Sequence, residues 1–194
     1  STPGRTLFPY TTLFRSLAFV TRAIYCKQAI SISYRSLSSG LTQREIVPHS
    51  LIYTGLRWHA RAFDRLKRQF SDFVINRIEQ PCLVENRVIS DTESKAADQQ
   101  WNQFVELQLA PHPSLRYPET IAHEYGLQNG ELRLSVRAAV AGYVLRRWNV
   151  DCSENHALEG PEYHLWLKNS QALTEIGNLV LAPGYSAINT DVRP

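Results

Sequence analysis

The residues of this chain that are best suited to chemistry lie in the run LRWHARAFD, from Leu56 to Asp64. The run is typical of a β-strand, in which successive side chains point to opposite faces. Arg57, His59 and Arg61 then share one face. The other face is apolar and consists of Leu56, Trp58, Ala60 and Ala62. Two guanidinium groups beside an imidazole repel one another unless an anion lies among them. We therefore expect the basic face to bind an anion such as phosphate.

Polar side chains from neighbouring predicted strands extend this candidate site. The full set of candidate ligand-binding residues is Tyr34, Ser36, Arg44, His49, Arg57, His59, Arg61 and Arg77. The arginines would bind phosphate oxygens, and Tyr34 would stack on a base. The alternative is a solvated strand face whose arginines pair with Asp64, Asp72 or Glu45, and the residue types alone favour this alternative.

The elements that must position these residues follow an antiparallel pattern. Leu17–Gln28 has the i, i+3, i+4 apolar spacing of a helix. Strands are predicted at 29–36, 43–53, 56–64 and 73–78. Pro48 cannot donate a hydrogen bond to a ladder, so it indicates an edge strand or a bulge. One helix followed by several short antiparallel strands favours a small closed barrel with Trp58 in its core.

The second half of the sequence predicts a separate unit with an α/β arrangement. Alternating apolar residues indicate three strands, at 104–109, 132–136 and 163–168. Pro118 and Gly126 bound one predicted helix, and Arg137–Trp148 carries the apolar stripe of another. Strand–helix–strand–helix order is typical of α/β proteins. The polar stretch at 85–101 has little periodicity and is predicted to be a linker.

Composition narrows the functional classes. A chain of 194 residues can hold one or two domains with a hydrophobic core. Its net charge of +3 is too small by itself to indicate a nucleic-acid-binding protein. No apolar run is long enough to span a bilayer. The three cysteines are far apart without CxxC spacing, which suits the cytoplasm and predicts no metal site.

The sequence lacks the motifs of well-known catalytic sites. His123-Glu124 has no second histidine four residues later, as a zinc-protease helix would require. No G-x-S-x-G turn accompanies the serines, and no glycine-rich loop could hold a phosphate. We therefore predict a protein that is not an enzyme and binds no cofactor.

The first sixteen residues, STPGRTLFPYTTLFRS, follow neither helical nor strand periodicity. The run PYTTLFRS resembles translated sequencing-adapter DNA, so the segment is either a non-native leader or an ordinary disordered one. The chain has no methionine, not even at position 1, which indicates a processed product or an internal fragment.

Three blocks of sequence, in order, resemble a WYL domain. They are R-x-I-x-P-H from Arg44 to His49, G-x-R-W-H-x-R-A-F-D from Gly55 to Asp64, and F-x-D-F-V-x-x-R-I from Phe70 to Ile78. Only the tryptophan of the Trp-Tyr-Leu signature is kept, as Trp58. The resemblance covers about Leu17 to Gln171. It is closest to the WYL regulators of bacterial phage-defence operons, whose C-terminal extension is often called WCX.

The resemblance implies a fold and a domain order. The fold is α+β, with a small Sm/SH3-like antiparallel β-barrel and an N-terminal helix, followed by an α/β C-terminal extension. The implied order is a leader at 1–16, a WYL domain at 17–84, a linker at 85–101, a WCX-like dimerization domain at 102–181 and a tail at 182–194. A winged helix-turn-helix, which binds the operator in the family, does not fit before the first strand. We therefore expect no specific binding of duplex DNA by these residues.

The resemblance also reverses the preference for a solvated strand face. It implies the ligand-sensing and dimerization part of a transcriptional regulator, which forms a homodimer in the cytoplasm. Its WYL domain would bind a nucleotide or oligonucleotide ligand, and operator DNA would be bound only through the missing winged helix-turn-helix. The alternative is a stand-alone module that binds single-stranded nucleic acid on its barrel face.

Overall fold

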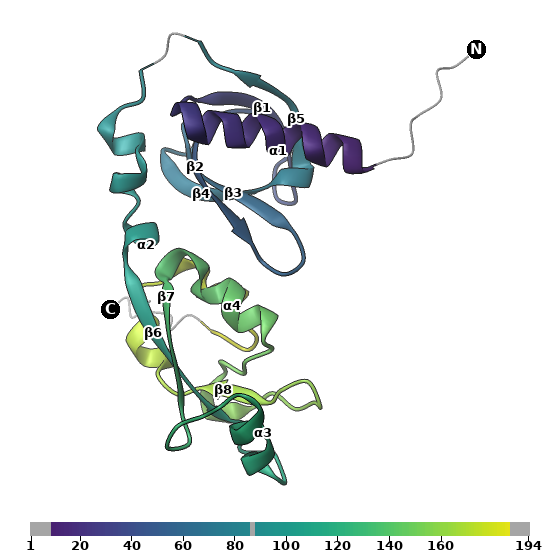
Figure 1. Cartoon of the computed structure of the whole chain (residues 1–194), viewed down its shortest axis with the longest axis vertical. Coiled ribbons are helices and arrows are strands. Elements are labelled where there is room, and N and C mark those ends of the chain that lie inside the picture. The colour runs from purple at the N-terminus through teal and green to yellow at the C-terminus, as the bar shows by residue number, and fades with distance from the viewer. Residues whose placement is uncertain (1–8, 86–87, 187–194) are drawn as a thin grey trace, which may run out of the picture. The chain divides into compact units, whose positions relative to one another are not determined.

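The chain folds into two units, residues 1–98 and residues 99–194 (Figure 1). The computed structural model describes residues 9–85 and 88–186. Each unit has its own antiparallel sheet and its own hydrophobic core, so the fold is α+β. Among the described residues, no helix is long and apolar enough to cross a membrane.

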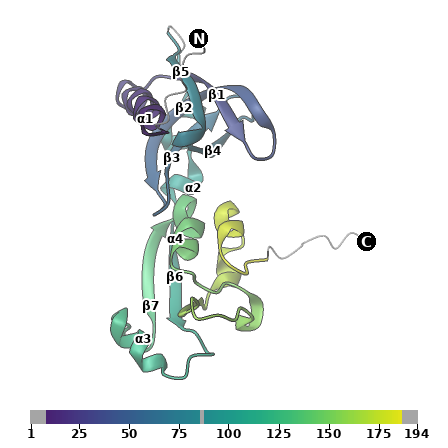
Figure 2. The ribbon, with the colours of Figure 1, turned by 90° about the vertical axis from the view of Figure 1, so that its right-hand side faces the viewer.

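The first unit opens with helix α1, Pro9–Cys26. It starts earlier than the helix predicted at 17–28, because residues 9–16 of the expected leader are also helical. Residues 1–8 lie outside the described ranges. Ser16 is buried, and its hydroxyl donates a hydrogen bond of 2.9 Å to the carbonyl of Ile78. Val20 and Ala23 pack in the core, and Figure 2 shows α1 lying on one side of the sheet.

Five antiparallel strands form the sheet of the first unit, in the order β4-β3-β2-β1-β5. Their bounds are β1 Ile30–Ser36, β2 Gly40–Tyr53, β3 Trp58–Asp64, β4 Gln69–Val74 and β5 Ile78–Leu83. Strand β2 is paired on both sides, and its register with β3 shifts between Pro48 and Ser50. Pro48 therefore marks a bulge and not an edge. The predicted strand at 73–78 is split by a 3-10 turn, η1 Ile75–Arg77.

The sheet is curled, but the closed barrel predicted from the sequence is not found. β4 and β5 are the two ends of the strand order, and no ladder joins them in the described ranges. Only η1 connects them, and a chain of that length reaches about 14 Å at most. The end strands of a flat five-stranded sheet would lie about 19 Å apart. The sheet must therefore bend, although its two ends do not pair.

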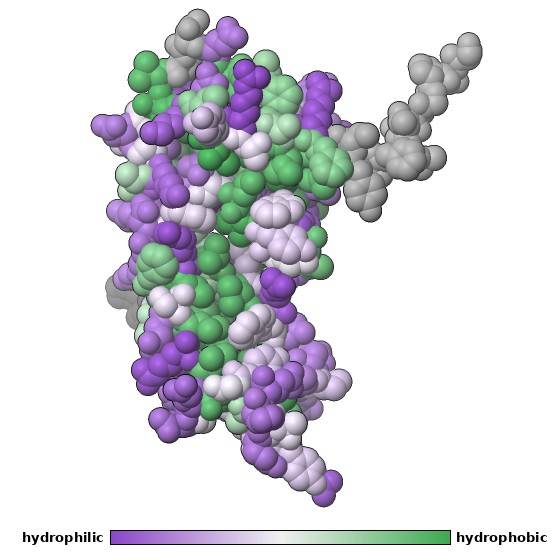
Figure 3. Space-filling model, viewed as in Figure 1, coloured by the Kyte–Doolittle hydropathy of each residue, from purple (hydrophilic) through white to green (hydrophobic). Residues whose placement is uncertain are grey.

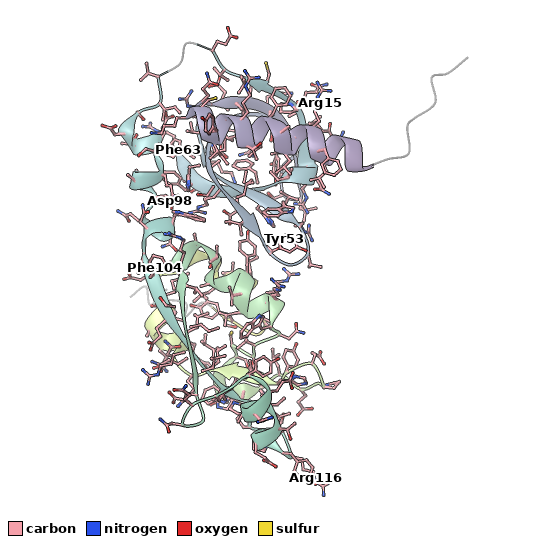
Figure 4. All side chains as sticks on the ribbon, in the orientation of Figure 1. Arg15, Tyr53, Phe63, Asp98, Phe104 and Arg116 are labelled. Carbon is pink, nitrogen blue, oxygen red and sulfur yellow. The ribbon has the colours of Figure 1, made fainter. Side chains whose placement is uncertain are left out.

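Alternation along the strands builds the core of the first unit. Ile32, Ala60 and Ala62 are buried on the face that packs against α1. Trp58 does not join them, because its side chain is 38% exposed and its ring lies against Tyr53, 5.1 Å between centroids. Figure 4 labels Tyr53, which lies at the turn end of the β2–β3 hairpin. The prediction of Trp58 in the core is therefore wrong, since the strand pattern continues past the end of the packed region.

The second unit holds a three-stranded antiparallel sheet in the order β7-β6-β8, flanked by short helices. Its strands and α-helices are α2 Gln99–Asn102, β6 Phe104–Pro111, α3 Pro118–Glu124, β7 Leu132–Arg137, α4 Ala141–Arg147 and β8 Leu165–Leu167. Its 3-10 turns are η4 Ala138–Val140, η5 Glu154–His156, η6 Ser170–Leu173 and η7 Gly177–Leu181. The α/β arrangement predicted for this unit is wrong, because β6 pairs antiparallel with both β7 and β8.

The core of the second unit lies beneath this sheet. Leu107 and Leu109 of β6 are buried and lie opposite Leu134 and Leu132 of β7, as the alternation predicted. Leu145 of α4 joins the same core. The expected tail begins with buried Ala182, and the carbonyl of Pro183 accepts a hydrogen bond of 2.9 Å from the Cys152 N–H. Residues 187–194 lie outside the described ranges.

Candidate functional site

The basic face of β3 is covered by protein. The exposed fraction is 6% for His59 and 8% for Arg61, whereas Arg57 at the end of the hairpin is exposed. Residues 88–98 reach this face from the chain that follows β5, with the 3-10 turns η2 Asp91–Glu93 and η3 Lys95–Ala97. This stretch was expected to be a linker, yet it contributes side chains to the candidate site.

Asp98 provides the central contact. Its carboxylate is 1% exposed and accepts hydrogen bonds from Arg61 Nε at 2.8 Å and Arg61 Nη2 at 3.0 Å. His49 Nε2 lies 3.1 Å from the same carboxylate, and His49 Nδ1 lies 3.0 Å from the Ser50 hydroxyl. Figure 4 shows Asp98 at the start of the chain that enters α2. A side-on pair of hydrogen bonds to a carboxylate is the geometry in which arginine also binds phosphate.

Asp72 of β4 is a second carboxylate at this site. It lies directly across the ladder from Arg61, and its Oδ1 accepts a hydrogen bond of 3.2 Å from Arg61 Nη1. Burial on its own lowers the pKa of Arg61, but the hydrogen bonds and charges of Asp98 and Asp72 outweigh it and raise that pKa. Arg61 therefore stays charged with two carboxylates around it. The alternative of a solvated strand face predicted that an arginine would pair with Asp72, and the Arg61–Asp72 ion pair is present.

His59 lies among the remaining basic residues of the predicted site. Its pKa is lowered, mainly by burial, and the positive charges of Arg57 and Arg77 lower it further, while Asp72 opposes them. Arg57 and Arg77 thus lie within electrostatic reach of the His59 ring. In the ranges that the structure describes, no ion pair is recorded for either arginine. Arg61, in contrast, is paired with Asp98 and Asp72.

Three predicted site residues lie elsewhere. The Tyr34 hydroxyl accepts a hydrogen bond of 3.1 Å from the Val74 N–H, and its ring packs edge-on against Phe73 at 5.0 Å between centroids. Tyr34 is therefore part of the core and not a platform for a base. Arg44 is buried in an ion pair with Asp64, which is one of the arginine partners predicted by the alternative of a solvated strand face.

Ser36 ends β1 in the tight turn that leads to β2. Its hydroxyl accepts a hydrogen bond of 3.2 Å from the Ser38 N–H. The structure thus brings together His49, His59 and Arg61, with Arg57 and Arg77 nearby. Tyr34, Ser36 and Arg44 are not part of this group.

Asp98 was not predicted to be a site residue, because it lies outside every predicted strand and belongs to a polar stretch without periodicity. A weak signal existed in Ser90 and Glu93, which have the spacing of a capping box. The structure forms that box, in which the Ser90 N–H donates to Glu93 Oε2 at 3.0 Å. Glu93 also accepts two hydrogen bonds from Arg65, from Nε at 2.6 Å and Nη2 at 2.8 Å. A box inside a presumed linker indicates an ordered segment.

A cleft of about 650 Å³ lies beside this cluster, within the first unit. Its walls come from the end of α1, from β2 and from residues 89–96, and it is lined by Ile24, Lys27, Val47, Pro48, His49 and Ile89 among others. Since His49 also contacts Asp98, the cleft and the carboxylate site share one side chain. The lining is more apolar than polar, so the cleft suits the apolar part of a ligand.

The second unit holds another buried histidine, His112, whose partners resemble a catalytic triad. His112 Nε2 lies 3.1 Å from Asp151 Oδ2, and Nδ1 lies 2.6 Å from the Ser114 hydroxyl. The Ser114 N–H also donates to Nδ1, so Nδ1 is the acceptor and the proton is on Nε2. Both ring nitrogens are used to fix a turn. Within the described ranges, no group of three or more metal-ligating side chains occurs.

Comparison with known protein families defines the class of the protein. The WYL domain family matches residues 15–83. The family described as "BrxR transcriptional regulator, C-terminal dimerization domain" matches residues 104–173. The chain thus joins a WYL domain to a BrxR-type C-terminal dimerization domain.

Among individual proteins, the chain is similar to the DNA-binding transcriptional repressor CapW. It is 32% identical to CapW of Escherichia coli strain KTE188 over 158 residues, which cover 79% of this chain and 51% of that protein. It is 31% identical to CapW of Pseudomonas aeruginosa over 161 residues, or 81% of this chain and 52% of that protein. The chain therefore spans about half the length of these relatives. They are named as repressors and not as enzymes, in agreement with the sequence-based prediction.

A solved structure, the proteasome accessory factor B/C of Arthrobacter aurescens, has a more distant similarity. Its TM-score is 0.40 at 19% identity, over 89% of this chain and 26% of that one. A similarity this distant carries no argument about fold or function.

Proposed function

We propose that this chain is the ligand-sensing and dimerization part of a bacterial transcriptional regulator and acts in the cytoplasm. Its WYL domain binds a nucleotide or a nucleic-acid-derived ligand. Operator DNA is bound by a winged helix-turn-helix in a longer protein. The CapW relatives, which are DNA-binding repressors twice as long as the matched region, support this division of labour.

The observation that carries the ligand proposal is the grouping of Arg57 and Arg77 around His59. The two arginines act on the same imidazole, and no carboxylate is recorded in an ion pair with either among the described residues. Two such guanidinium groups are suited to neighbouring phosphates of one ligand. Arg61, with its two carboxylates, would serve as the inner end of the site.

The ligand proposal is tested by titration with short single-stranded oligonucleotides and cyclic nucleotides, followed by calorimetry and thermal shift. Arg57→Ala and Arg77→Ala should each weaken binding by roughly 1–3 kcal/mol, the scale of a lost charged hydrogen bond. Arg22→Ala on the exposed surface of α1 is the matched control and should leave the affinity unchanged. Equal affinities for all four proteins would show that this face is not the ligand site.

We also propose that the second unit forms a homodimer. Apolar side chains remain partly exposed at its surface, including Val136 of β7 and Val144 of α4, and Figure 3 shows apolar side chains gathered beside α4. The match to a dimerization domain family supports a second copy of the chain as the partner. Sedimentation of the 22.2 kDa chain should give about twice that mass. A monomer at tens of micromolar would contradict the proposal.

The alternative is a stand-alone module for single-stranded nucleic acid, and the exposed Tyr53–Trp58 pair favours it. Two exposed rings beside the exposed Arg57 are the kind of surface on which bases stack. In this case affinity should rise with oligonucleotide length and fall steeply with salt, and bound bases should quench Trp58 fluorescence. A sensor for one nucleotide would show neither the length dependence nor such a salt slope.

A further inference from the structure

The bond between Asp98 and Arg61 has the form of a ligand contact. Arg61 offers Nε and Nη2 to two oxygens of one carboxylate, at 2.8 and 3.0 Å, and His49 approaches one of those oxygens at 3.1 Å. The same three donors would match two oxygens of a phosphate group. An anion site is therefore already built into this face, and a side chain of the protein occupies it.

Asp98, the side chain that occupies this site, belongs to the segment with the least regular structure in the first unit. Residues 88–98 form two 3-10 turns, belong to no ladder and contain mostly exposed side chains. The segment is held at its start by the Val88 carbonyl, which accepts a hydrogen bond of 3.4 Å from Arg65 Nη2, and near its middle by the two hydrogen bonds between Arg65 and Glu93. Its last residue, Asp98, is held by Arg61. Asp98 is also the last residue of the first unit, so its release would free the chain just before the second unit begins.

Of the two carboxylates at Arg61, only Asp98 can leave without disturbing the sheet. Asp72 is fixed in β4 by the β3–β4 ladder, where it lies opposite Arg61. Asp98 is followed directly by α2 and can move with residues 88–98. A third anion beside two carboxylates would be repelled, so an arriving phosphate must replace one of them.

We propose that Asp98 is an internal occupant of the anion site and that a phosphate group of the ligand displaces it from Arg61, which releases residues 88–98. The proposal rests on the proposed ligand-sensing function and adds how that site is regulated. Because Asp98 is tethered, it competes at an effective concentration on the order of millimolar or above. The apparent affinity for ligand is then reduced by the small fraction of molecules in which Asp98 has left.

The first test measures the binding of inorganic pyrophosphate to the full chain by calorimetry. Asp98→Ala empties the site and should bind pyrophosphate at least about tenfold more tightly than wild type, because the internal competitor is gone. Asp72→Ala is the matched control, since it removes the same charge from Arg61 without emptying the Asp98 position. A gain for Asp98→Ala that does not exceed the gain for Asp72→Ala would reduce the effect to charge alone and overturn the proposal.

The second test uses only the wild-type chain, so it does not depend on how well Asp98→Ala folds. Hydrogen exchange is measured with saturating pyrophosphate and with sodium chloride at the same ionic strength. Exchange within residues 88–98 should rise with pyrophosphate and not with chloride. Unchanged exchange would overturn the displacement. If Arg57→Ala and Arg77→Ala still weaken oligonucleotide binding in that case, the proposed function stands and only the role of Asp98 is wrong.

Discussion

Asp98 and Arg61 are 37 positions apart in the sequence, yet two hydrogen bonds join the carboxylate of one to the guanidinium of the other. Both side chains are buried, and Asp98 belongs to no helix or strand. A buried charge that loses its partner costs far more than an exposed one. The stability of the first unit therefore depends on this pair more strongly than a basic strand face would suggest.

Arg61→Ala should destabilise the protein by about 3–5 kcal/mol, because it leaves the buried carboxylate of Asp98 without its main partner. Urea unfolding of the two proteins measures the loss. The control is Arg57→Ala, which removes an exposed arginine of the same strand region and should change the free energy of unfolding by less than about 0.5 kcal/mol.

The double variant Arg61→Ala/Asp98→Ala removes both charges and should recover part of that loss. If the two single losses simply add in the double variant, the side chains are not coupled. The structural interpretation of the pair would then be wrong.

Trp58→Ala should cost only roughly 1–2 kcal/mol, since the side chain is partly exposed and its main ring contact is Tyr53. Phe73→Ala, in the buried core beside Tyr34, should cost about 3–5 kcal/mol. Both losses are measured by urea unfolding under identical conditions. A loss for Trp58→Ala as large as that for Phe73→Ala would mean that Trp58 is buried in solution.

Local patterns in the sequence predicted most of the strands of this protein. Alternation placed β1, β6 and β7 correctly, and it put His59 and Arg61 on one face of β3, whereas Arg57 lies just before that strand. Pro118 and Gly126 bracketed α3 because proline favours a first helical turn and Gly126 adopts a positive φ of 64°. These signals depend on neighbours in the chain, which the sequence displays directly.

Which segment covers a strand face depends on contacts between residues that are distant in the sequence. Such contacts could not be predicted from the sequence. The period-2 pattern of β3 shows that Arg61 faces away from Ala60 and Ala62, but it does not show that residues 88–98 fold back over it. The open strand order was hidden for the same reason, because closure depends on whether β4 meets β5. Alternation also cannot show where packing ends, so Trp58 was assigned to the core.

The stability of the protein should fall on acidification below about pH 6.5, in part because of His59. Its folded-state pKa lies below the unfolded value of 6.5, mainly through burial and also through Arg57 and Arg77. The unfolded chain then binds the extra proton first. The contribution is fully present above pH 6.5 and is lost as the pH falls through the folded pKa.

His59→Gln removes this titration, so its free energy of unfolding should depend less on pH between 5 and 7 than that of wild type. His123→Gln, at an exposed position of α3, is the control and should follow the wild-type curve. Urea unfolding at several pH values gives the comparison. Parallel curves for His59→Gln and wild type would contradict the depressed pKa of His59.

The three thiols should differ sharply in reactivity. Cys26 and Cys82 are exposed, whereas Cys152 is buried, and burial together with the charge of Asp151 raises its pKa to about 12. The thiolate is the reactive form, so Cys152 is protected both by its pKa and by its surroundings. At pH 8 a disulfide reagent such as dithionitrobenzoate should modify Cys26 and Cys82 quickly in the native protein and Cys152 only after denaturation. Native Cys152→Ala is the control and should react with the same number of equivalents of reagent as native wild type. A rapid third equivalent from native wild type would show that the second unit opens readily around Asp151.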